Sequence, residues 1–189
     1  MKLSRITPNL LLVVSLFFLS LGAQSQTNYT VQPNSKLKIT GTSSLHDWEM
    51  VSSAASGKAV LEVANTELKA IKSITVEMQA ESLKSGKSGM DKNAYKALKT
   101  DQFKTVKFEL KSAVLVKEGE WTFTGTFTIA GVSKPAVFKV LAKTVAGVTT
   151  FDGSYKCKLT DFGIKPPTAL MGTVKTGDDV TFVFNVAFK

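Results

Sequence analysis

The chain has 189 residues, a formal charge of +9, a single cysteine and a single histidine. One cysteine excludes an internal disulfide, and one histidine without a glycine-rich phosphate loop excludes the common catalytic and metal-binding motifs, so we predict no catalytic residue, no metal and no cofactor. Arginine occurs only at position 5, and the scarcity of the side chain that reads guanine and clamps phosphate argues against binding to nucleic acid.

The N-terminus has the features of a cleaved signal peptide. A basic start is followed by an apolar run at residues 10–21 and by a small-x-small cleavage pattern, Ala23-Gln24-Ser25. The apolar run is shorter than the ~20 residues that a membrane-spanning helix needs, and no later run approaches that length. We therefore predict a signal peptide at residues 1–25, one exported domain at residues 26–189 that is periplasmic or secreted, and no integral membrane segment after cleavage.

Most of the remaining sequence alternates apolar and polar residues, which is typical of antiparallel strands. The clearest alternation covers residues 121–129, where apolar side chains share one face and threonines the other. Gly125 interrupts the apolar face, and we expect either a bend there or space for a ligand. The expected strands cover residues 36–44, 58–63, 74–83, 106–116, 121–130, 136–145, 149–159 and 180–188.

Residues 88–99 break this pattern, because Met90, Ala94, Ala97 and Leu98 recur at helical spacing. A serine at position 88 and an aspartate three residues later have the spacing of a capping box. Eight strands and one short helix predict an all-β fold, an eight-stranded antiparallel barrel in which the helix closes or flanks one end. The interior of such a barrel is either filled by side chains or holds one small ligand.

The segment Ser-Leu-His-Asp-Trp at residues 44–48 is the densest group of distinctive residues outside the strand faces. Two interpretations stay open. In the first, Trp48 packs at a strand end and His46 forms a hydrogen bond with Asp47. In the second, His46 lies at the mouth of a pocket and donates to a ligand headgroup while Trp48 contacts the apolar part of the ligand.

Cys157 alternates with apolar neighbours in the expected strand at residues 149–159. No histidine, arginine or second cysteine lies near it in the sequence to activate a thiolate. We therefore predict that Cys157 faces inward as a small buried apolar residue.

Several segments, in this order along the chain, resemble the YceI-like family: residues 44–48, Leu98 with Phe103, Val106-Lys107-Phe108, residues 125–135 and Asp161-Phe162-Gly163-Ile164. The turn Thr-Ile-x-Gly-Val-x-Lys-Pro within residues 125–135 is the most specific of them. The resemblance covers residues 29–188. It implies an exported bacterial protein with a lipocalin-like barrel whose apolar cavity binds polyisoprenoids, including long isoprenoid chains with quinone or phosphate heads.

Together, the patterns and the resemblance predict a periplasmic binding or carrier protein, not an enzyme, that holds a long-chain isoprenoid lipid or isoprenoid quinone in the barrel interior. The alternative is a structural or interaction protein with a solid barrel, whose lysine-rich surface binds an anionic partner or makes transient contact with an anionic membrane. An enzyme acting on a lipid headgroup is a third hypothesis. A lipid carrier needs a cavity of several hundred Å³, which a solid barrel lacks. The candidate ligand-binding residues are His46, Trp48, Phe108, Trp121, Phe123, Phe127, Ile129, Phe138, Phe182 and Phe184.

Overall fold

The computed structural model describes residues 27–189, so the predicted signal peptide lies outside the described residues. The strands are β1 (Thr27–Thr30), β2 (Lys36–Ser43), β3 (Trp48–Ser52), β4 (Ala55–Ala64), β5 (Glu67–Gln79), β6 (Thr105–Lys117), β7 (Glu120–Ile129), β8 (Val132–Val145), β9 (Val148–Lys158), β10 (Thr168–Ala169) and β11 (Val174–Phe188). The α-helix is α1 (Ser88–Leu98), and short 3₁₀ turns form η1 (Ala80–Ser82), η2 (Leu159–Phe162) and η3 (Leu170–Gly172).

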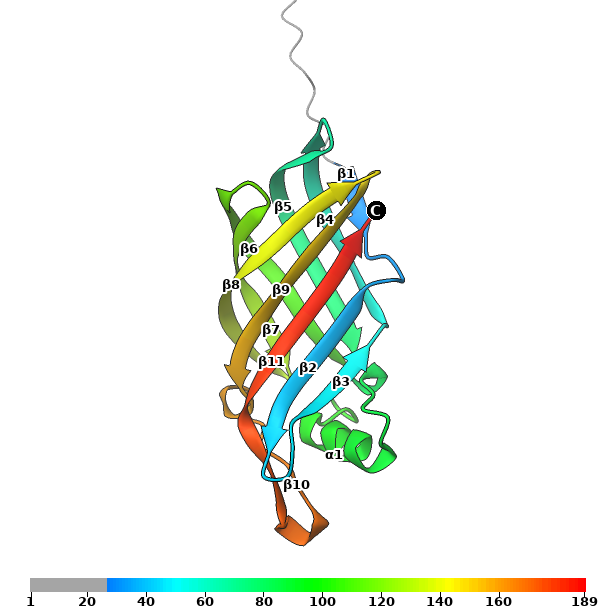
Figure 1. The fold of residues 1–189 in the computed structure, drawn as a ribbon, viewed down its shortest axis with the longest axis vertical. Coiled ribbons are helices and arrows are strands. Elements are labelled where there is room, and N and C mark those ends of the chain that lie inside the picture. The colour runs from blue at the N-terminus through cyan, green and yellow to red at the C-terminus, as the bar shows by residue number, and fades with distance from the viewer. Residues whose placement is uncertain (1–26) are drawn as a thin grey trace, which may run out of the picture.

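All strands belong to one antiparallel sheet that curls around an apolar interior (Figure 1). The strand order is β1-β4-β5-β6-β7-β8-β9-β11-β2-β3, with β10 paired to β11. The end strands β1 and β3 do not pair with each other. The amide groups of Thr30 and Lys189 instead donate to each other's carbonyls, at 2.8 and 3.0 Å, and join the end of β1 to the end of β11.

Within residues 27–189, the all-β, antiparallel character and the single α-helix are confirmed, whereas the count of eight strands is wrong because eleven are present. The additional strands β1, β3 and β10 have four, five and two residues. Such short segments carry too little alternation to be detected. The end of β5 was also misplaced, because the chain leaves the sheet after Gln79 and enters η1.

Strand β7 has the predicted alternation: Trp121, Phe123, Phe127 and Ile129 are buried, and the threonines between them are partly exposed. The expected space at Gly125 is absent, however. A Cβ atom at this glycine would lie 2.5 Å from the ring of Phe108, which already fills the position. Gly125 therefore accommodates an aromatic ring of the neighbouring strand rather than a ligand.

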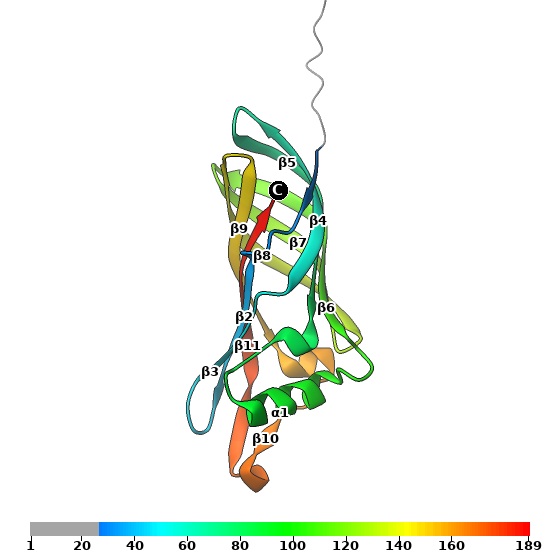
Figure 2. The same cartoon turned by 90° about the vertical axis from the view of Figure 1, so that its right-hand side faces the viewer.

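Helix α1 lies across the lower end of the curled sheet (Figure 2) and packs Met90, Ala94 and Leu98 against the core. The hydroxyl of Tyr95 links the helix to the η1 region, because its single hydrogen is shared between the carbonyl oxygens of Glu81 and Leu83, at 2.9 and 2.7 Å. This end of the sheet is therefore covered by a helix held through both apolar and polar contacts.

The predicted capping box at the start of α1 is wrong. The residue before the first helical turn is Lys87, whose side chain makes no capping hydrogen bond. The carboxylate of Asp91 instead turns back to the preceding loop and accepts from the amide and hydroxyl of Ser85, at 2.8 and 2.6 Å. The carboxylate thus stabilises the loop that leads into the helix.

Candidate functional site

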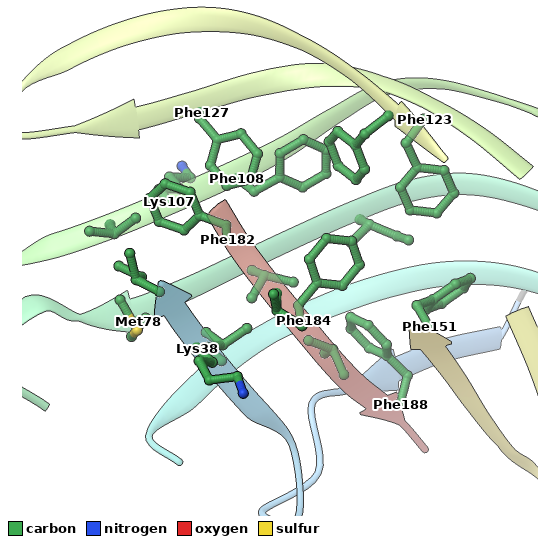
Figure 3. A pocket seen from close by; sticks show the side chains of 18 residues that line it. Lys38, Met78, Lys107, Phe108, Phe123, Phe127, Phe151, Phe182, Phe184 and Phe188 are labelled. Carbon is green, nitrogen blue, oxygen red and sulfur yellow. The ribbon is translucent and has the colours of Figure 1, made fainter. Parts of the chain in front are cut away.

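A cavity of about 80 Å³ lies on the inner face of the curled sheet. Aliphatic side chains of β2, β5, β6 and β11 form part of its wall: Leu37, Ile39, Ile74, Val76, Met78, Val106 and Val186. Eight phenylalanines from β6, β7, β8, β9 and β11 form most of the remaining wall (Figure 3): Phe108, Phe123, Phe127, Phe138, Phe151, Phe182, Phe184 and Phe188. The lining is therefore suited to an apolar molecule.

The phenylalanine rings pack against one another at the edge-to-face and offset distances that aromatic pairs prefer. Phe127 is central: its ring centroid lies 4.9 Å from that of Phe108, 5.0 Å from that of Tyr155 and 5.5 Å from that of Phe182. Phe138 contacts Phe108 and Phe184 in edge-to-face pairs at 5.3 and 5.6 Å. These contacts leave the cavity small and make it dependent on the positions of a few rings.

Two glycines leave space for two of these rings on the inner face of the sheet. A Cβ atom at Gly125 would clash with Phe108, and one at Gly153 would lie 2.6 Å from the ring of Phe184. Each ring therefore occupies the place of a missing side chain on a neighbouring strand. Both rings also line the cavity.

The two lysines beside the cavity add no unpaired charge to it. The ammonium group of Lys38 pairs with Glu49 at 3.2 Å, and that of Lys107 pairs with Glu109 at 2.9 Å and with Glu77 at 3.7 Å. The hydrogen bond to Glu109 is the main cause that raises the pKa of Lys107. Both cations are therefore balanced by carboxylates and offer no free partner for a charged headgroup.

The structure brings six of the ten predicted residues to the cavity: Phe108, Phe123, Phe127, Phe138, Phe182 and Phe184. Trp121 and Ile129 face inward and are buried, but they belong to the surrounding core. His46 and Trp48 do not line the cavity. Both line a groove on the surface at the lower end of the molecule, and Trp48 also lines a second one.

His46 and Trp48 make the local contacts that the packing interpretation of their segment requires, and both also belong to the wall of the groove beside α1. The ring of Trp48 covers Gly41, where a Cβ atom would lie 2.3 Å from it, and its Nε1 donates to the carbonyl of Thr42 at 2.9 Å. The Nδ1 atom of His46 lies 2.6 Å from the backbone carbonyl oxygen of Asp47. Trp48 thus serves the local structure of the β2–β3 hairpin.

Sequence reasoning missed Phe151, Phe188 and the aliphatic part of the lining. A signal for Phe188 was present, since it lies on the same alternating face of residues 180–188 as Phe182 and Phe184. The aliphatic residues were not identifiable as lining, because their part of the wall depends on which strands the curl brings opposite one another.

Cys157 is half-buried and packs against the core. Burial is the main cause that raises the pKa of its thiol to about 11, and the carboxylates of Asp161, Asp178 and Asp179 add to the shift. A thiol with this pKa is almost fully protonated at neutral pH and is a poor nucleophile.

Within residues 27–189, no group of three or more histidine, cysteine, aspartate or glutamate side chains is arranged to hold a metal ion. Across the same residues, none of the helices has the length and apolar character needed to span a bilayer. The candidate ligand site of the described residues is therefore the cavity with the almost entirely apolar lining.

The model of the YceI-like domain matches residues 24–188, and the chain therefore belongs to the YceI-like family. No curated protein sequence matches it. Among solved structures, BcnA of Burkholderia cenocepacia is 16% identical with a TM-score of 0.69, and the match covers 83% of this chain and 98% of BcnA. A polyisoprenoid binding domain from Saccharophagus degradans, implicated in plant cell wall breakdown, is 10% identical with a TM-score of 0.66 and coverages of 87% and 99%.

The YceI protein of Campylobacter jejuni is 23% identical, with a TM-score of 0.55 and coverages of 68% and 78%. At these identities the three structures show a shared fold. They agree with the lipocalin-like barrel that the resemblance implies, and the family assignment rests on the match to the domain model.

Proposed function

We propose that this chain is an exported binding or carrier protein that holds a long apolar lipid, a polyisoprenoid or an isoprenoid quinone, inside its curled sheet. The observation that carries the proposal is the cavity lined by eight phenylalanines and bordered by no unpaired charge. The similarity in fold to the polyisoprenoid binding domain from Saccharophagus degradans supports the choice of ligand class. The role is binding rather than catalysis.

Burial of apolar surface supplies the affinity. At about 25 cal/mol per Å², a few hundred Å² of isoprenoid removed from water contribute several kcal/mol without any polar contact. The cavity of about 80 Å³ is smaller than the ~300–1,000 Å³ typical of ligand sites. A long chain therefore enters only if rings move, and Phe182 and Phe184 are the best candidates because they line the cavity while half-buried.

The small cavity also favours a second candidate, a structural or interaction protein with a nearly solid barrel. The two functions differ in what happens when the cavity is filled. If a larger side chain is introduced into the cavity of a solid barrel, the stability changes according to how well that side chain fits, and there is no ligand affinity to lose. A lipid carrier loses affinity because the ligand and the new side chain compete for the same volume.

Val186→Phe tests this difference, because Val186 is buried and lines the cavity. Val137→Phe is the matched control: it makes the same change on β8 at a residue that is 63% exposed and does not line the cavity. Titration with an isoprenoid quinone should show binding to the wild type and to Val137→Phe, and at least about tenfold weaker binding to a folded Val186→Phe variant. Equal affinity of all three proteins, or no binding to any, would reject the cavity as the site.

The exported location is part of the proposal. The supporting observation is the pattern of basic, apolar and small residues before Gln26. N-terminal sequencing of the mature protein should begin near Gln26. Recovery of Met1 from the exported fraction would contradict cleavage at this position.

A further inference from the structure

The lower tip of the molecule presents three large apolar side chains to solvent. Leu45, in the turn between β2 and β3, is 66% exposed, and Leu170 and Met171, in η3, are 72% and 108% exposed. Figures 1 and 2 show the β2–β3 turn and the segment between β10 and β11 at this same end. A side chain as exposed as Met171 makes almost no contact with its own protein, so core packing does not explain its position.

The hairpin formed by β10 and β11 fixes the positions of Leu170 and Met171 in η3. Thr168 pairs with Lys175 and Ala169 with Val174 across β10 and β11, and the amide of Thr173 donates to the carbonyl of Leu170 at 3.1 Å. Leu170 and Met171 have φ angles of 48° and 55°, a left-handed conformation that is unfavourable for residues with large side chains. The two exposed apolar side chains are therefore held at a protruding tip by a backbone in an unfavourable left-handed conformation.

A groove of about 910 Å³ runs between the β2–β3 turn, the start of α1 and the β10–β11 segment, and Leu45, Leu170 and Met171 form part of its wall. Its charged lining consists of Lys87 and Lys92, and no carboxylate lines it. Both lysines are exposed, and neither forms an ion pair with any residue in the part of the chain that the structure describes. The intervening Asp91 is buried and accepts hydrogen bonds from Ser85. The groove thus combines a mainly apolar wall with two unpaired cations, and it is complementary to a surface that is both apolar and anionic.

We propose that this lower end is a membrane-docking surface. Leu45, Leu170 and Met171 insert into the interfacial region of an anionic bilayer, and Lys87 and Lys92 contact lipid phosphate groups. An apolar tip flanked by cations is the combination that binds peripheral proteins to anionic lipid. The β10–β11 segment extends beyond the rest of the sheet (Figures 1 and 2), and a fluid bilayer accommodates such a protruding segment without a preformed partner pocket, which favours a membrane over a protein partner. The surface lies outside the cavity, so its existence does not depend on which ligand the cavity holds.

Co-sedimentation with vesicles tests the proposal. Vesicles of phosphatidylglycerol and phosphatidylcholine in equal parts, and vesicles of phosphatidylcholine alone, are used without any isoprenoid. The wild type should bind the anionic vesicles, bind the neutral ones far less, and lose binding as salt rises. The variant Leu170→Ser/Met171→Ser should lower the partition coefficient about tenfold or more. The variant Lys87→Gln/Lys92→Gln should lower it about fivefold for each lysine, which corresponds to ~1 kcal/mol each.

Two matched controls distinguish binding through this surface from non-specific apolar or electrostatic binding to vesicles. Val137→Ser/Leu141→Ser removes apolar residues of β8 that are 63% and 60% exposed, and Lys111→Gln/Lys143→Gln removes exposed lysines of β6 and β8. Both controls should bind vesicles like the wild type. Equal losses in control and lower-end variants would overturn the proposal.

Absence of wild-type binding to anionic vesicles would also overturn it, and binding to polyglutamate in that case would assign the groove to an acidic protein segment. The cavity variant Val186→Phe should dock normally. A failure of docking is therefore distinguishable from a failure of lipid binding in the cavity.

Discussion

At the scale of single residues, Phe127 links the stability of the chain to its cavity. Its side chain is 7% exposed, lines the cavity and stacks on Tyr155 at an interplanar angle of 10°. Phe127→Ala should lower the free energy of unfolding by about 3–5 kcal/mol, because it removes burial and leaves a void. It should also change the affinity for an isoprenoid quinone, since the void merges with the cavity. Denaturant melts and ligand titration measure the two effects.

Phe162→Ala is the control for Phe127→Ala. Phe162 is 2% exposed and belongs to the core, but it does not line the cavity. This variant should lose comparable stability while the remaining folded protein binds ligand with unchanged affinity. If both variants alter affinity equally, the effect at Phe127 arises from general loosening of the fold.

The thiol of Cys157 provides a test of burial at one position. Because burial raises its pKa to about 11, less thiolate is present at neutral pH than for a free cysteine, and half-burial further slows access. Alkylation of the native protein by a bulky thiol reagent should be slow and should accelerate with pH up to about pH 11. Unfolding in urea should restore a rate typical of a free thiol. Rapid labelling of the native protein at neutral pH would show that Cys157 is not packed against the core.

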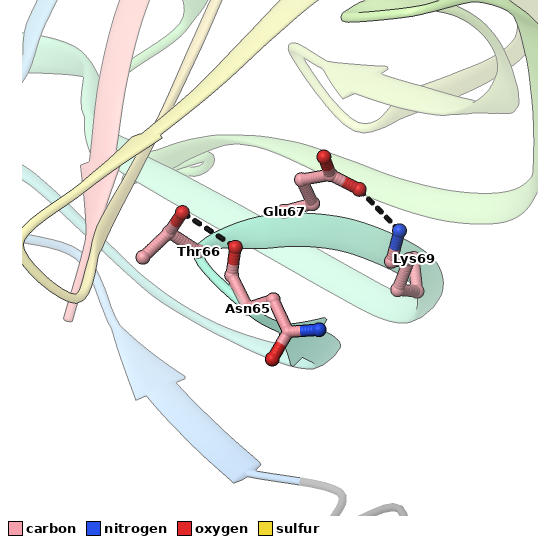
Figure 4. A network of polar contacts seen from close by, with 4 residues as sticks. All are labelled: Asn65, Thr66, Glu67 and Lys69. Atoms are coloured by element: carbon pink, nitrogen blue, oxygen red, sulfur yellow. Dashed lines mark hydrogen bonds and ion pairs between the residues drawn. The ribbon is translucent and has the colours of Figure 1, made fainter.

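At the scale of elements, the β4–β5 hairpin stores backbone strain in its turn. Asn65 and Thr66 have φ angles of 51° and 66°, and the hydroxyl of Thr66 donates to the carbonyl of Asn65 at 2.5 Å (Figure 4). Glu67 and Lys69 form an ion pair beside the turn. A two-residue turn with positive φ angles prefers glycine at its second position, and a β-branched threonine is unfavourable there.

Thr66→Gly should therefore raise the free energy of unfolding by about 0.5–1 kcal/mol, because relief of strain exceeds the entropy cost of glycine. Thr66→Ala keeps a Cβ atom and should give little of this gain. Denaturant melts of the two variants measure the difference. A gain that is equal in both would assign the effect to removal of the threonine hydroxyl and not to backbone strain.

The elements that sequence reasoning predicted well are long and strictly alternating. The bounds of β7 were predicted almost correctly because apolar and polar residues alternate along nearly its whole length, and this alternation assigns each residue to one face. The short strands β1 and β3 were not predicted, because pairing with long neighbours defines them more than their own composition does. The capping box failed because Asp91 has a competing partner, Ser85, which the spacing alone does not reveal.

The candidate site shows the same division. Alternation predicts which phenylalanines point inward, and six of them line the cavity as a result. Alternation does not predict which residues of the neighbouring strands the rings contact in the interior. Phe108 lies over Gly125 and Phe184 over Gly153, and these cross-strand placements of two cavity-lining rings depend on register.

At the scale of the whole molecule, stability should depend on acidic pH through hydrogen-bonded carboxylates. Hydrogen bonds from Ser85 lower the pKa of Asp91, and hydrogen bonds from the hydroxyl and amide of Thr160 lower that of Asp178. A lowered pKa in the folded state stabilises the fold above the ordinary value of 3.8, and this contribution is lost as pH falls through the folded value. The free energy of unfolding should therefore be steady near neutral pH and fall below about pH 4.

Thr160→Val tests the sign of this effect, because it removes the hydroxyl that is the main cause of the shift at Asp178. The pKa of Asp178 should then move toward its ordinary value. Compared with the wild type, the variant should be less stable at neutral pH, and the difference should shrink in acid. A stability difference that is constant from neutral to acidic pH would show that the hydrogen bond to Asp178 does not contribute to it.

The central claim is that the inner face of the curled sheet holds a long apolar lipid. Its most direct test is the mass of the intact mature protein, purified from the exporting host without detergent and measured under conditions that preserve noncovalent complexes. We predict a complex of one chain with one long apolar lipid, together with uptake of added isoprenoid quinone after delipidation. The mass of the bare polypeptide, combined with no uptake of the added quinone, would contradict the claim.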